Sequence, residues 1–259
     1  MGSRLKRSSG PTACLKRVVS GRHCRLRPWR QRGTVPHLPE RAFGQEVQKM
    51  KLLLLGATGL VGGRTLELAL ASDAFSEVIA PTRKPLPPSD KLVNPVGLHV
   101  GEFVPVVGSY MPDAVICALG TTQAKARSKE AFRHVDYELP VAFGKAAHAA
   151  GAETYAIVTA MGASTASRFF YTRTKGEAEH DIREIGFRSL TICRPSIIDG
   201  DRNEVRPVEG AGLTLARLLA PILPKKFHVN PADVIAAALL NAAIVAKPGC
   251  RWIYAEEMS

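Results

Sequence analysis

The sequence has few cysteines and no pattern that would pair them. Its five cysteines, Cys14, Cys24, Cys117, Cys193 and Cys250, lie far apart, and no C-x-x-C occurs. A disulfide framework or a zinc module is therefore not expected. Cys117 and Cys193 stand in apolar runs, so we interpret them as small buried hydrophobic residues. This cysteine usage is typical of a reducing compartment.

Long apolar runs and metal-ligand spacings are also missing. The longest apolar stretch late in the chain, Val234–Ala246, has 13 residues, whereas a helix needs about 20 to span a bilayer. We therefore expect neither a membrane span nor a membrane partner. The histidines His134, His148, His180 and His228 show no ligand spacing, so no metal is expected.

Acidic residues are scarce in one part of the chain only. Residues 1–49 hold nine Arg, three Lys and two Glu, which is +10 of the net charge of +12. The other 210 residues hold 23 basic and 21 acidic residues. A domain this close to neutral lacks the broad basic face that nucleic acids need, so no nucleic-acid partner is expected.

Residues 1–49 have only 15 apolar positions and four prolines, so we expect a disordered basic tail. Three interpretations stay open: a transit peptide, because the segment is rich in Arg and poor in acids; a basic arm for polyanions; or a start that is not native, with Met50 as the initiator. We favour the last, because Met50 directly precedes the first predicted strand and the prolines interrupt any presequence helix. We accordingly expect a cytoplasmic protein.

From residue 51 onward, short apolar runs alternate with helical patterns. Continuous apolar runs are typical of strands that are buried on both faces. The alternation predicts an α/β fold, a Rossmann-like doubly wound parallel sheet with helices on both faces, in a single domain over residues 50–259. The predicted strands are Lys51–Leu55, Glu77–Thr82, Val96–Val100, Asp113–Ala118, Thr154–Ala160, Ser189–Cys193 and Arg251–Tyr254, and the predicted helices are Leu60–Ala71, Glu138–Ala150, Phe170–Ile185 and Val234–Ala246.

A glycine-rich turn joins the first strand to the first helix. Gly56, Gly59 and Gly62 form G-x-x-G-x-x-G, in which the glycines permit a tight turn, close approach of a pyrophosphate, and close helix–strand packing. The helix N-terminus supplies free N–H groups for the phosphates. The sequence therefore predicts a dinucleotide site, and the residues expected to bind the cofactor here are Gly56, Thr58, Gly59, Leu60, Val61 and Gly62.

The end of the second strand indicates which dinucleotide binds. An acidic residue there would hold the ribose 2′-OH of NAD, but the sequence runs Ala80-Pro81-Thr82-Arg83-Lys84 without a carboxylate. The cations of Arg83 and Lys84, with the Thr82 hydroxyl, suit a 2′-phosphate. We predict NADP as the cofactor, with NAD disfavoured.

A Tyr and a Lys stand four residues apart at the start of the helix that follows the fifth strand. Tyr171 and Lys175 share one helix face at this spacing. A phenol has an ordinary pKa near 10, and an ammonium beside it favours the phenolate. The pair is therefore a candidate acid/base, in which Lys175 can also reach ribose hydroxyls.

With these motifs in order, the chain resembles the atypical, extended-like short-chain dehydrogenase/reductases, and most of all the Tat-interacting-protein oxidoreductase group and its bacterial NAD(P)-binding relatives. The resemblance runs from about Lys51 to Glu256. It is carried by Gly56–Gly62, Gly101-Glu102-Phe103, Cys117-Ala-Leu-Gly-Thr-Thr122, Val135-Asp136-Tyr137, Tyr171–Glu177, and Arg194-Pro195 followed by Asp201-Arg202.

The resemblance implies roles at the matching positions. Glu102 and Phe103 would border the adenine, and Tyr171 and Lys175 would be the acid/base pair. The remaining residues with an implied cofactor contact are Leu119, Gly120 and Thr121 over the ribose, and Pro195 to Ile197 near the nicotinamide carboxamide. The family's catalytic hydroxyl stands at the end of strand five, where Thr159 is the nearest hydroxyl and Ser164 the next.

These observations predict an NADP(H)-binding oxidoreductase that passes a hydride to or from a small carbonyl or alcohol substrate. An anionic substrate stays open, because Arg202 and Arg206 lie in a polar segment of the C-terminal residues 195–259, which we expect on the substrate side. Two alternatives also stay open: a nucleotide-sugar epimerase or dehydratase, and a catalytically weak NADP(H)-binding regulator or redox sensor. The second is favoured because the family that the chain resembles usually has a serine at the end of strand five, where Thr159 is the nearest hydroxyl here. A homodimer is compatible with the sequence.

Overall fold

The computed structural model describes residues 49–199 and 229–258, which hold a sheet of seven strands. The predicted tail, apart from Lys49, and the proposed anion clamp of Arg202 and Arg206 lie outside the described residues. The strands follow the order β3-β2-β1-β4-β5-β6-β9, and every neighbouring pair is parallel. Their bounds are β1 (Met50–Leu55), β2 (Phe75–Ile79), β3 (Leu92–Val93), β4 (Ala114–Cys117), β5 (Thr154–Val158), β6 (Ser189–Arg194) and β9 (Gly249–Tyr254).

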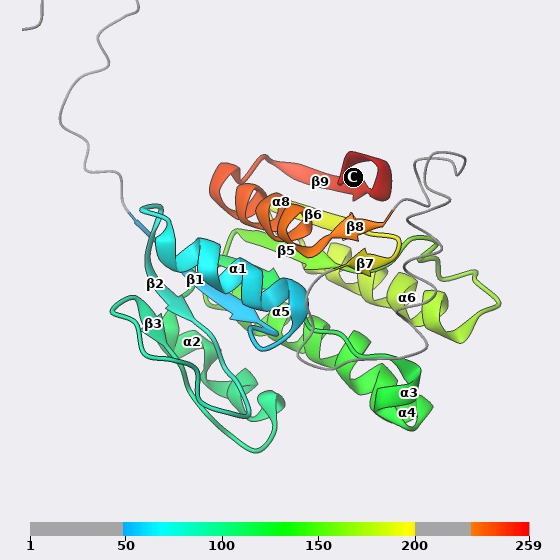
Figure 1. Cartoon of the computed structure of the whole chain (residues 1–259), viewed down its shortest axis with the longest axis horizontal. Helices are drawn as coiled ribbons and strands as arrows, with labels where there is room; N and C mark the ends of the chain where they lie inside the picture. Colours follow the sequence, from blue (N-terminus) through cyan, green and yellow to red (C-terminus); the bar gives the residue numbers. More distant parts are fainter. Residues whose placement is uncertain (1–48, 200–228, 259) are drawn as a thin grey trace, which may run out of the picture. The chain divides into compact units, whose positions relative to one another are not determined.

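Helices cover both faces of the sheet (Figure 1). Apolar residues of α1 (Leu60–Ala71) and α8 (Ala232–Val245) form one core with the sheet, while α2 (Val107–Tyr110), α5 (Leu139–Ala149) and α6 (Phe170–Ile185) contribute to the other. The predicted fold, a doubly wound parallel sheet between two helical layers, is confirmed. This order of strands is that of nucleotide-binding α/β proteins.

The first strand shows how the sequence specifies a central strand. Leu52 and Leu54 belong to the core on the side of α1, whereas Leu53 and Leu55 belong to the core on the side of α5. All four side chains are at most 1% exposed. A strand with helices on both sides must be apolar at every position, which is why an unbroken apolar run stands here.

The predicted third strand, Val96–Val100, is wrong. The third strand is Leu92–Val93, and Val96 makes only an isolated bridge with Thr82. Pro95 has no N–H to donate to a ladder, so it cannot continue a strand in the sheet. After the bridge, the chain turns into a 3₁₀ helix, η1 (Val100–Val106).

Several other predicted boundaries differ by a few residues. The second strand was predicted at Glu77–Thr82, but β2 begins at Phe75, which is fully buried, and ends at Ile79 ahead of Pro81. The predicted helix Glu138–Ala150 is the later part of a longer helical run, in which α4 (Lys129–Arg133) leads through a π-helical turn, η2 (His134–Glu138), into α5. The short helix α3 (Gln123–Ala126) precedes this run.

The segment after β6 divides between two places. β7 (Ile198–Asp199) pairs in parallel with β8 (Asn230–Pro231) as a separate two-stranded sheet. α8 and β9 instead complete the main sheet and its core, and η4 (Ala255–Glu257) follows. Among the described residues, no helix is both long and apolar enough to cross a membrane.

Candidate functional site

The carboxyl ends of β1 and β4 meet where the strand order reverses direction. The turn after β1 touches the chain after β4, because a side-chain carbon built on Gly56 would lie 2.6 Å from the carbonyl oxygen of Ala118. In open α/β sheets, ligands bind in the crevice at this edge, outside the strand ends. The topology thus favours a ligand site at the carboxyl ends of the strands, where the predicted residues lie.

The glycine turn leaves space that only glycines allow. Gly56 has a φ of +87°, in the left-handed region, and a side-chain carbon on Gly62 would lie 2.0 Å from the carbonyl oxygen of Gly56. The Gly59 N–H donates to that same carbonyl at 2.9 Å and Gly59 precedes α1 without a side-chain cap. An anion at the helix N-terminus would therefore meet backbone N–H groups that no side chain caps, which fits the pyrophosphate of a dinucleotide.

The other predicted residues of this turn divide between surface and core. Thr58 and Gly59 are exposed, and Leu60 is half-buried. Val61 is 7% exposed and packs in the core beside α8. Its backbone N–H in the first turn of α1, rather than its side chain, is the group that can face a phosphate.

Arg83 and Lys84 stand exposed on the turn after β2. Neither makes an ion pair with any described residue. Thr82, which the sequence grouped with these cations, is 3% exposed, and its hydroxyl donates to the Lys84 carbonyl at 2.6 Å. Asn94 donates to that hydroxyl at 2.8 Å and to the Ala80 carbonyl at 2.6 Å. The Thr82 hydroxyl therefore shapes the turn that carries Arg83 and Lys84, and its proton is engaged by the Lys84 carbonyl.

Glu102 and Phe103, the expected adenine neighbours, lie on η1. The exposed Glu102 carboxylate accepts a hydrogen bond from the His99 N–H at 3.2 Å and so caps this helix. Phe103 is half-buried and packs against the core on the side of α5. These contacts hold η1 in place next to the strands that end at the crevice.

Lys175 lies on the second turn of α6 and is 5% exposed. Its Nζ lies 2.7 Å from Oδ1 of Asp136, which η2 contributes and which is 1% exposed. Burial lowers the pKa of the Lys175 ammonium, but the Asp136 carboxylate and the Tyr171 phenol together raise it by more, so this pKa ends above its usual value. Lys175 is therefore charged at neutral pH.

The loop after β4 is joined to this ion pair. The Thr121 N–H donates to Oδ2 of Asp136 at 2.9 Å. A side-chain carbon on the exposed Gly120 would lie 3.4 Å from Oδ1 of Asp136 and 3.7 Å from Nζ of Lys175, and Leu119 is half-buried in the core. Gly120 and Thr121, two of the three residues that were expected over the ribose, thus lie against the buried pair.

Tyr171 is 36% exposed and lies one turn before Lys175. The ring packs at a centroid distance of 5.6 Å against Phe132 of α4, which is fully buried. Phe132 and Asp136 are four residues apart on one helix, as Tyr171 and Lys175 are on the other, so the two helices run side by side in the same direction. The run from α4 to η2 therefore supports both members of the Tyr–Lys pair.

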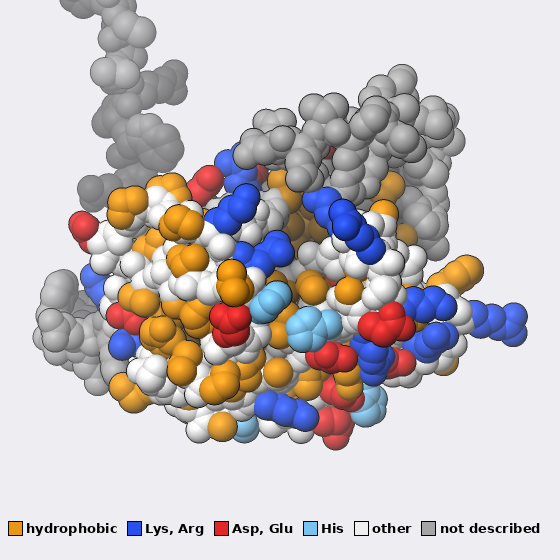
Figure 2. Space-filling model, turned by 90° about the horizontal axis from the view of Figure 1, so that it is seen from below, with side chains coloured by type: hydrophobic (Ala, Val, Ile, Leu, Met, Phe, Trp, Pro, Cys, Tyr) orange, Lys and Arg blue, Asp and Glu red, His pale blue; other side chains and the backbone are white. Residues whose placement is uncertain are grey.

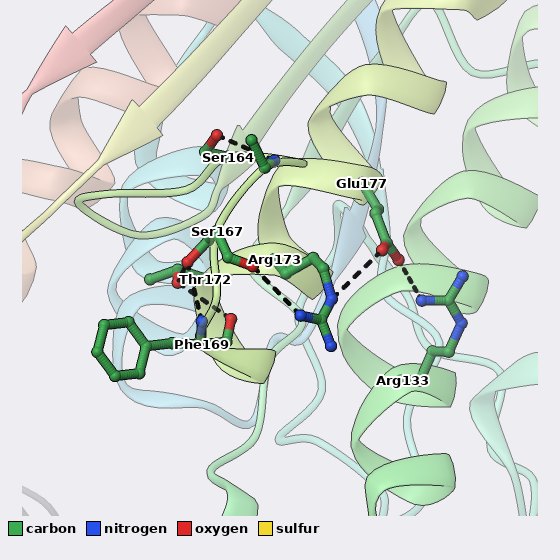
Figure 3. A network of polar contacts seen from close by, with 8 residues as sticks. Arg133, Ser164, Ser167, Phe169, Thr172, Arg173 and Glu177 are labelled. Carbon is green, nitrogen blue, oxygen red and sulfur yellow. Dashed lines mark hydrogen bonds and ion pairs between the residues drawn. The ribbon is translucent and has the colours of Figure 1, made fainter.

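The loop before α6 is tied to the first turns of that helix (Figure 3). Arg173 donates to the Ser167 carbonyl at 3.2 Å and lies 3.9 Å from Glu177, which Arg133 of α4 also reaches. The Ser167 and Thr172 hydroxyls are 2.6 Å apart. These contacts hold residues 164–169 beside Tyr171, with Phe169 78% exposed at the helix start.

Thr159, the predicted catalytic hydroxyl, is 4% exposed. Its hydroxyl donates to Oε1 of Glu179 at 2.6 Å, and Glu179 also forms a two-pronged ion pair with Arg194 at the end of β6. A hydroxyl has one proton to donate, and in this arrangement Glu179 takes it. Ser164, the next hydroxyl, is exposed and accepts from the Ala166 N–H at 3.3 Å.

The chain after β6 brings Pro195 and Ile197 to the same edge. The Met161 N–H donates to the Pro195 carbonyl at 2.9 Å, which joins the loops after β5 and β6. Ile197 is 48% exposed. Asn230 is fully buried, and its side chain accepts from the Ser196 N–H at 2.8 Å.

Charges of both signs are interspersed on the face seen in Figure 2, with apolar side chains gathered on one side. This distribution on the visible face is not the continuous basic field of a nucleic-acid surface. Within residues 49–199 and 229–258, no group of three or more His, Cys, Asp or Glu side chains could hold a metal ion. Cys117 and Cys193 are fully buried, and burial raises the pKa of the Cys193 thiol to about 12.

Comparison with known proteins identifies the family of this chain. No family model matches the chain. The mitochondrial fmp52 protein of Aspergillus clavatus is 36% identical over 205 residues, which are 76% of this chain and 88% of the relative. The mitochondrial FMP52 protein of Candida albicans is 34% identical over 175 residues, 66% of this chain and 75% of the relative. The chain belongs to the Fmp52 family.

Solved structures that resemble this Fmp52 protein share its fold. Bordetella bronchiseptica WbmH in complex with NAD⁺ has a TM-score of 0.61 at 14% identity, over 79% of this chain and 75% of that chain. The UDP-Glc/GlcNAc 4-epimerase of Campylobacter jejuni has a TM-score of 0.58 at 12% identity, over 79% and 78%. The PhqB reductase domain of Penicillium fellutanum has a TM-score of 0.56 at 15% identity, over 79% and 66%.

The predicted cytoplasmic location is wrong. The relatives that place the chain in the Fmp52 family are named as mitochondrial proteins. The four prolines of residues 1–49 do not exclude a transit peptide, because a segment rich in Arg and poor in acids is also what a transit peptide needs.

Sequence reasoning about the Fmp52 chain missed the residues that support the site. Asp136 was predicted only as part of a resemblance, because the exposed Glu138 stands two residues away and nothing in the sequence distinguishes the buried acid from the exposed one. Glu179 repeats the four-residue spacing of Tyr171 and Lys175, and this places it on the same face of α6. Phe132 and Asn94 carried no signal, because each acts through contacts with distant parts of the chain.

Proposed function

We propose that this Fmp52 protein is an NADP(H)-dependent oxidoreductase of the short-chain dehydrogenase/reductase type, acting on a small carbonyl or alcohol. The observation that carries the proposal is the buried, charged Lys175 one turn after the exposed Tyr171, beside the loop that follows β4. The closer likeness to the Tat-interacting-protein group is part of the proposal. NADP(H) would supply or accept the hydride.

The residues of the chain would bind the cofactor and transfer the proton. The turn at Gly56, Gly59 and Gly62 would receive the pyrophosphate at the N-terminus of α1, and Arg83 would receive the 2′-phosphate. Tyr171 would exchange a proton with the substrate oxygen through its phenolic hydroxyl, and the Lys175 ammonium would favour the phenolate while that proton is away.

A second candidate function rests on Thr159. Because its hydroxyl donates to Glu179, a substrate carbonyl would lack this donor, and proton transfer would depend on Tyr171 alone. The second candidate is therefore an NADP(H)-binding regulator with weak or no turnover. A nucleotide-sugar epimerase is a variant of the enzyme proposal, supported by the shared fold with such enzymes.

The cofactor is tested by calorimetry with NADPH and NADH. We expect NADPH to bind about tenfold or more tightly, because a charge-assisted contact to a phosphate contributes about 1.5–3 kcal/mol. Arg83→Ala should remove most of this preference. Lys247→Ala is the matched control, because Lys247 is exposed after the end of α8, at the opposite edge of the sheet, and should change nothing. Equal affinity of the native protein for both cofactors contradicts the preference for NADP.

Turnover separates the two candidates. In a screen of aldehydes, ketones and UDP-sugars with NADPH or NADP⁺, Tyr171→Phe should lower kcat by about 10²-fold or more. NADPH affinity should stay within about threefold, because the lost hydroxyl would contact only the reacting oxygen. Apolar aldehydes belong in the screen because three apolar side chains are exposed in the loops beside the proposed site. Met161 and Phe169 stand in the loop that precedes Tyr171, and Ile197 follows β6. NADPH binding without any turnover would favour the regulator.

We further propose that the protein works in mitochondria, as the names of its relatives say of them. The composition of residues 1–49, with twelve basic and two acidic residues, suits an import signal. A fluorescent reporter fused after residue 49 should enter mitochondria, and one fused to a variant with the nine arginines changed to glutamine should not. A cytosolic signal from the first fusion would overturn the role of this segment.

A further inference from the structure

Asp136 is a buried carboxylate that is joined to two different elements. Its Oδ1 lies 2.7 Å from Nζ of Lys175 on α6, and its Oδ2 accepts the N–H of Thr121 in the loop after β4 at 2.9 Å. The side chain of Asp136 is fully buried and that of Lys175 is 6% exposed. Charged side chains are almost never buried to this degree unless they are paired.

The π-helical turn η2 places this carboxylate. Asp136 is the middle residue of His134–Glu138, between α4 and α5. A π-turn inside an α-helix is rare and is found most often at functional sites. One turn earlier, Phe132 of the same helical run packs against the Tyr171 ring.

We propose that Asp136 is a positioning residue that keeps Lys175 in the form of an ammonium and ties it to the loop after β4. The inference rests on the proposed function, because the groups that it would position are Lys175 and the loop that is expected over the cofactor ribose. Asp136 itself would touch neither substrate nor cofactor.

The physical reason is the cost of a buried charge. The groups that face Lys175 are Asp136 from η2, Tyr171 from α6 and Cys117 from the end of β4. Burial raises the pKa of the Cys117 thiol, and a phenol is neutral at pH 7, so Asp136 supplies the countercharge among these groups. Without it, burial would lower the pKa of Lys175, and a neutral amine would neither favour the phenolate of Tyr171 nor bind ribose hydroxyls as strongly.

Asp136→Asn tests the inference in the protein without cofactor. The amide has the shape of the carboxylate and can still accept the Thr121 N–H, but it carries no charge. In the native protein the pKa of Lys175 lies above its unfolded value near 10.4, so this residue adds no pH dependence to stability between about pH 7 and pH 10. In the variant this pKa falls below the unfolded value, the unfolded chain binds more protons in that window, and stability rises with pH.

The expected result is a melting deficit that depends on pH. Asp136→Asn should melt about 6 °C or more below the native protein at pH 7, and less than about half as far below it near pH 10. A deficit of constant size would show that Asp136 makes only a structural contact and would overturn the inference.

Glu177→Gln is the matched control. Glu177 also joins α4 to α6, but its partners Arg133 and Arg173 stay charged throughout this pH range, so its deficit should not change with pH. A second variant guards against a protein that fails to fold at pH 7. Asp136→Asn combined with Lys175→Met leaves no unpaired buried charge and should melt above Asp136→Asn alone. A double variant that melts no higher would also overturn the inference.

The same variants bear on the proposed function in a separate measurement. The affinity of Asp136→Asn for NADPH should fall between about pH 7 and pH 9 as Lys175 loses its proton, while the native affinity stays level. The melting result decides about Asp136 whether or not NADPH binds. Failure of the proposed function would instead appear as a native protein that binds no NADPH.

Discussion

Gly176 stands between Lys175 and Glu177 in α6, and the backbone of Ser164 occupies the place of a side chain at this residue. A side-chain carbon there would lie 2.3 Å from the carbonyl carbon of Ser164. Glycine is unfavourable inside a helix by about 1 kcal/mol relative to alanine. The glycine is needed because it lets the loop before α6 pack directly against the helix at the residue after Lys175.

Gly176→Ala should therefore destabilise the protein although it improves helix propensity. Overpacking of this kind costs about 1–3 kcal/mol, so the melting temperature should fall by about 4 °C or more. Gly63→Ala on α1 is the matched control, because its new carbon would meet the Ala57 carbonyl oxygen at an ordinary 3.5 Å. It should raise the melting temperature by about 2 °C, as expected for propensity alone. Calorimetry of both variants checks the pair, and a stabilised Gly176→Ala protein would show that the loop has room to move.

At the scale of elements, the loop after β6 depends on a single asparagine of β8. Asn230 accepts the Ser196 N–H at 2.8 Å and donates to the carbonyls of Ala255 and Met258 at 2.8 and 3.0 Å. Its own N–H donates to the Ile197 carbonyl at 2.8 Å. The last residues of the chain are in this way joined to the segment that we expect near the nicotinamide.

Asn230→Ala should remove the three hydrogen bonds that this side chain makes with Ser196, Ala255 and Met258. Each unsatisfied buried group costs about 1–3 kcal/mol, so we expect a total loss of about 3 kcal/mol or more in the free energy of unfolding. Asn241→Ala on the exposed side of α8 is the control and should stay within about 0.5 kcal/mol of the native protein. Denaturant unfolding measures both, and equal losses would mean that the buried amide contributes no more than a surface one.

At the scale of the whole molecule, both cores and all seven strands of the main sheet lie in residues 50–258. Residues 1–49 carry most of the net charge and few apolar side chains. The buried apolar side chains that stabilise the fold therefore lie in residues 50–258, whereas most of the net charge lies in residues 1–49.

Residues 50–259 alone should melt within about 2 °C of the whole chain, because a segment that buries little apolar surface adds little stability. Comparing the two proteins by calorimetry at two salt concentrations checks this. Raising the salt should shift both melting temperatures alike, because the charges of residues 50–259 are screened equally in both proteins. A drop several times larger than expected would show that residues 1–49 pack against the sheet.

The sequence by itself predicted the strands of the main sheet except β3, the long helices α1, α5, α6 and α8, and the edge of the sheet at which we expect the site. The apolar run Leu52–Leu55, which a glycine-rich turn follows directly, indicates a strand buried on both faces, and Gly56 and Gly62 indicate a turn that approaches other backbone closely. Helix Phe170–Ile185 was predicted with the bounds that it has, because its pattern is local. Such local patterns predict an element without any knowledge of the residues that it contacts in the fold.

Tertiary structure alone decided what the polar side chains do. Thr82 and Thr159 look like free hydroxyls in the sequence, but Lys84, Asn94 and Glu179 engage them in the fold. Nothing near Asp136 in the sequence reveals that it meets Lys175, which is 39 positions further along the chain. The reason is physical: the pairing of a buried polar group depends on which elements the packing of the sheet brings together, and only the whole fold determines that.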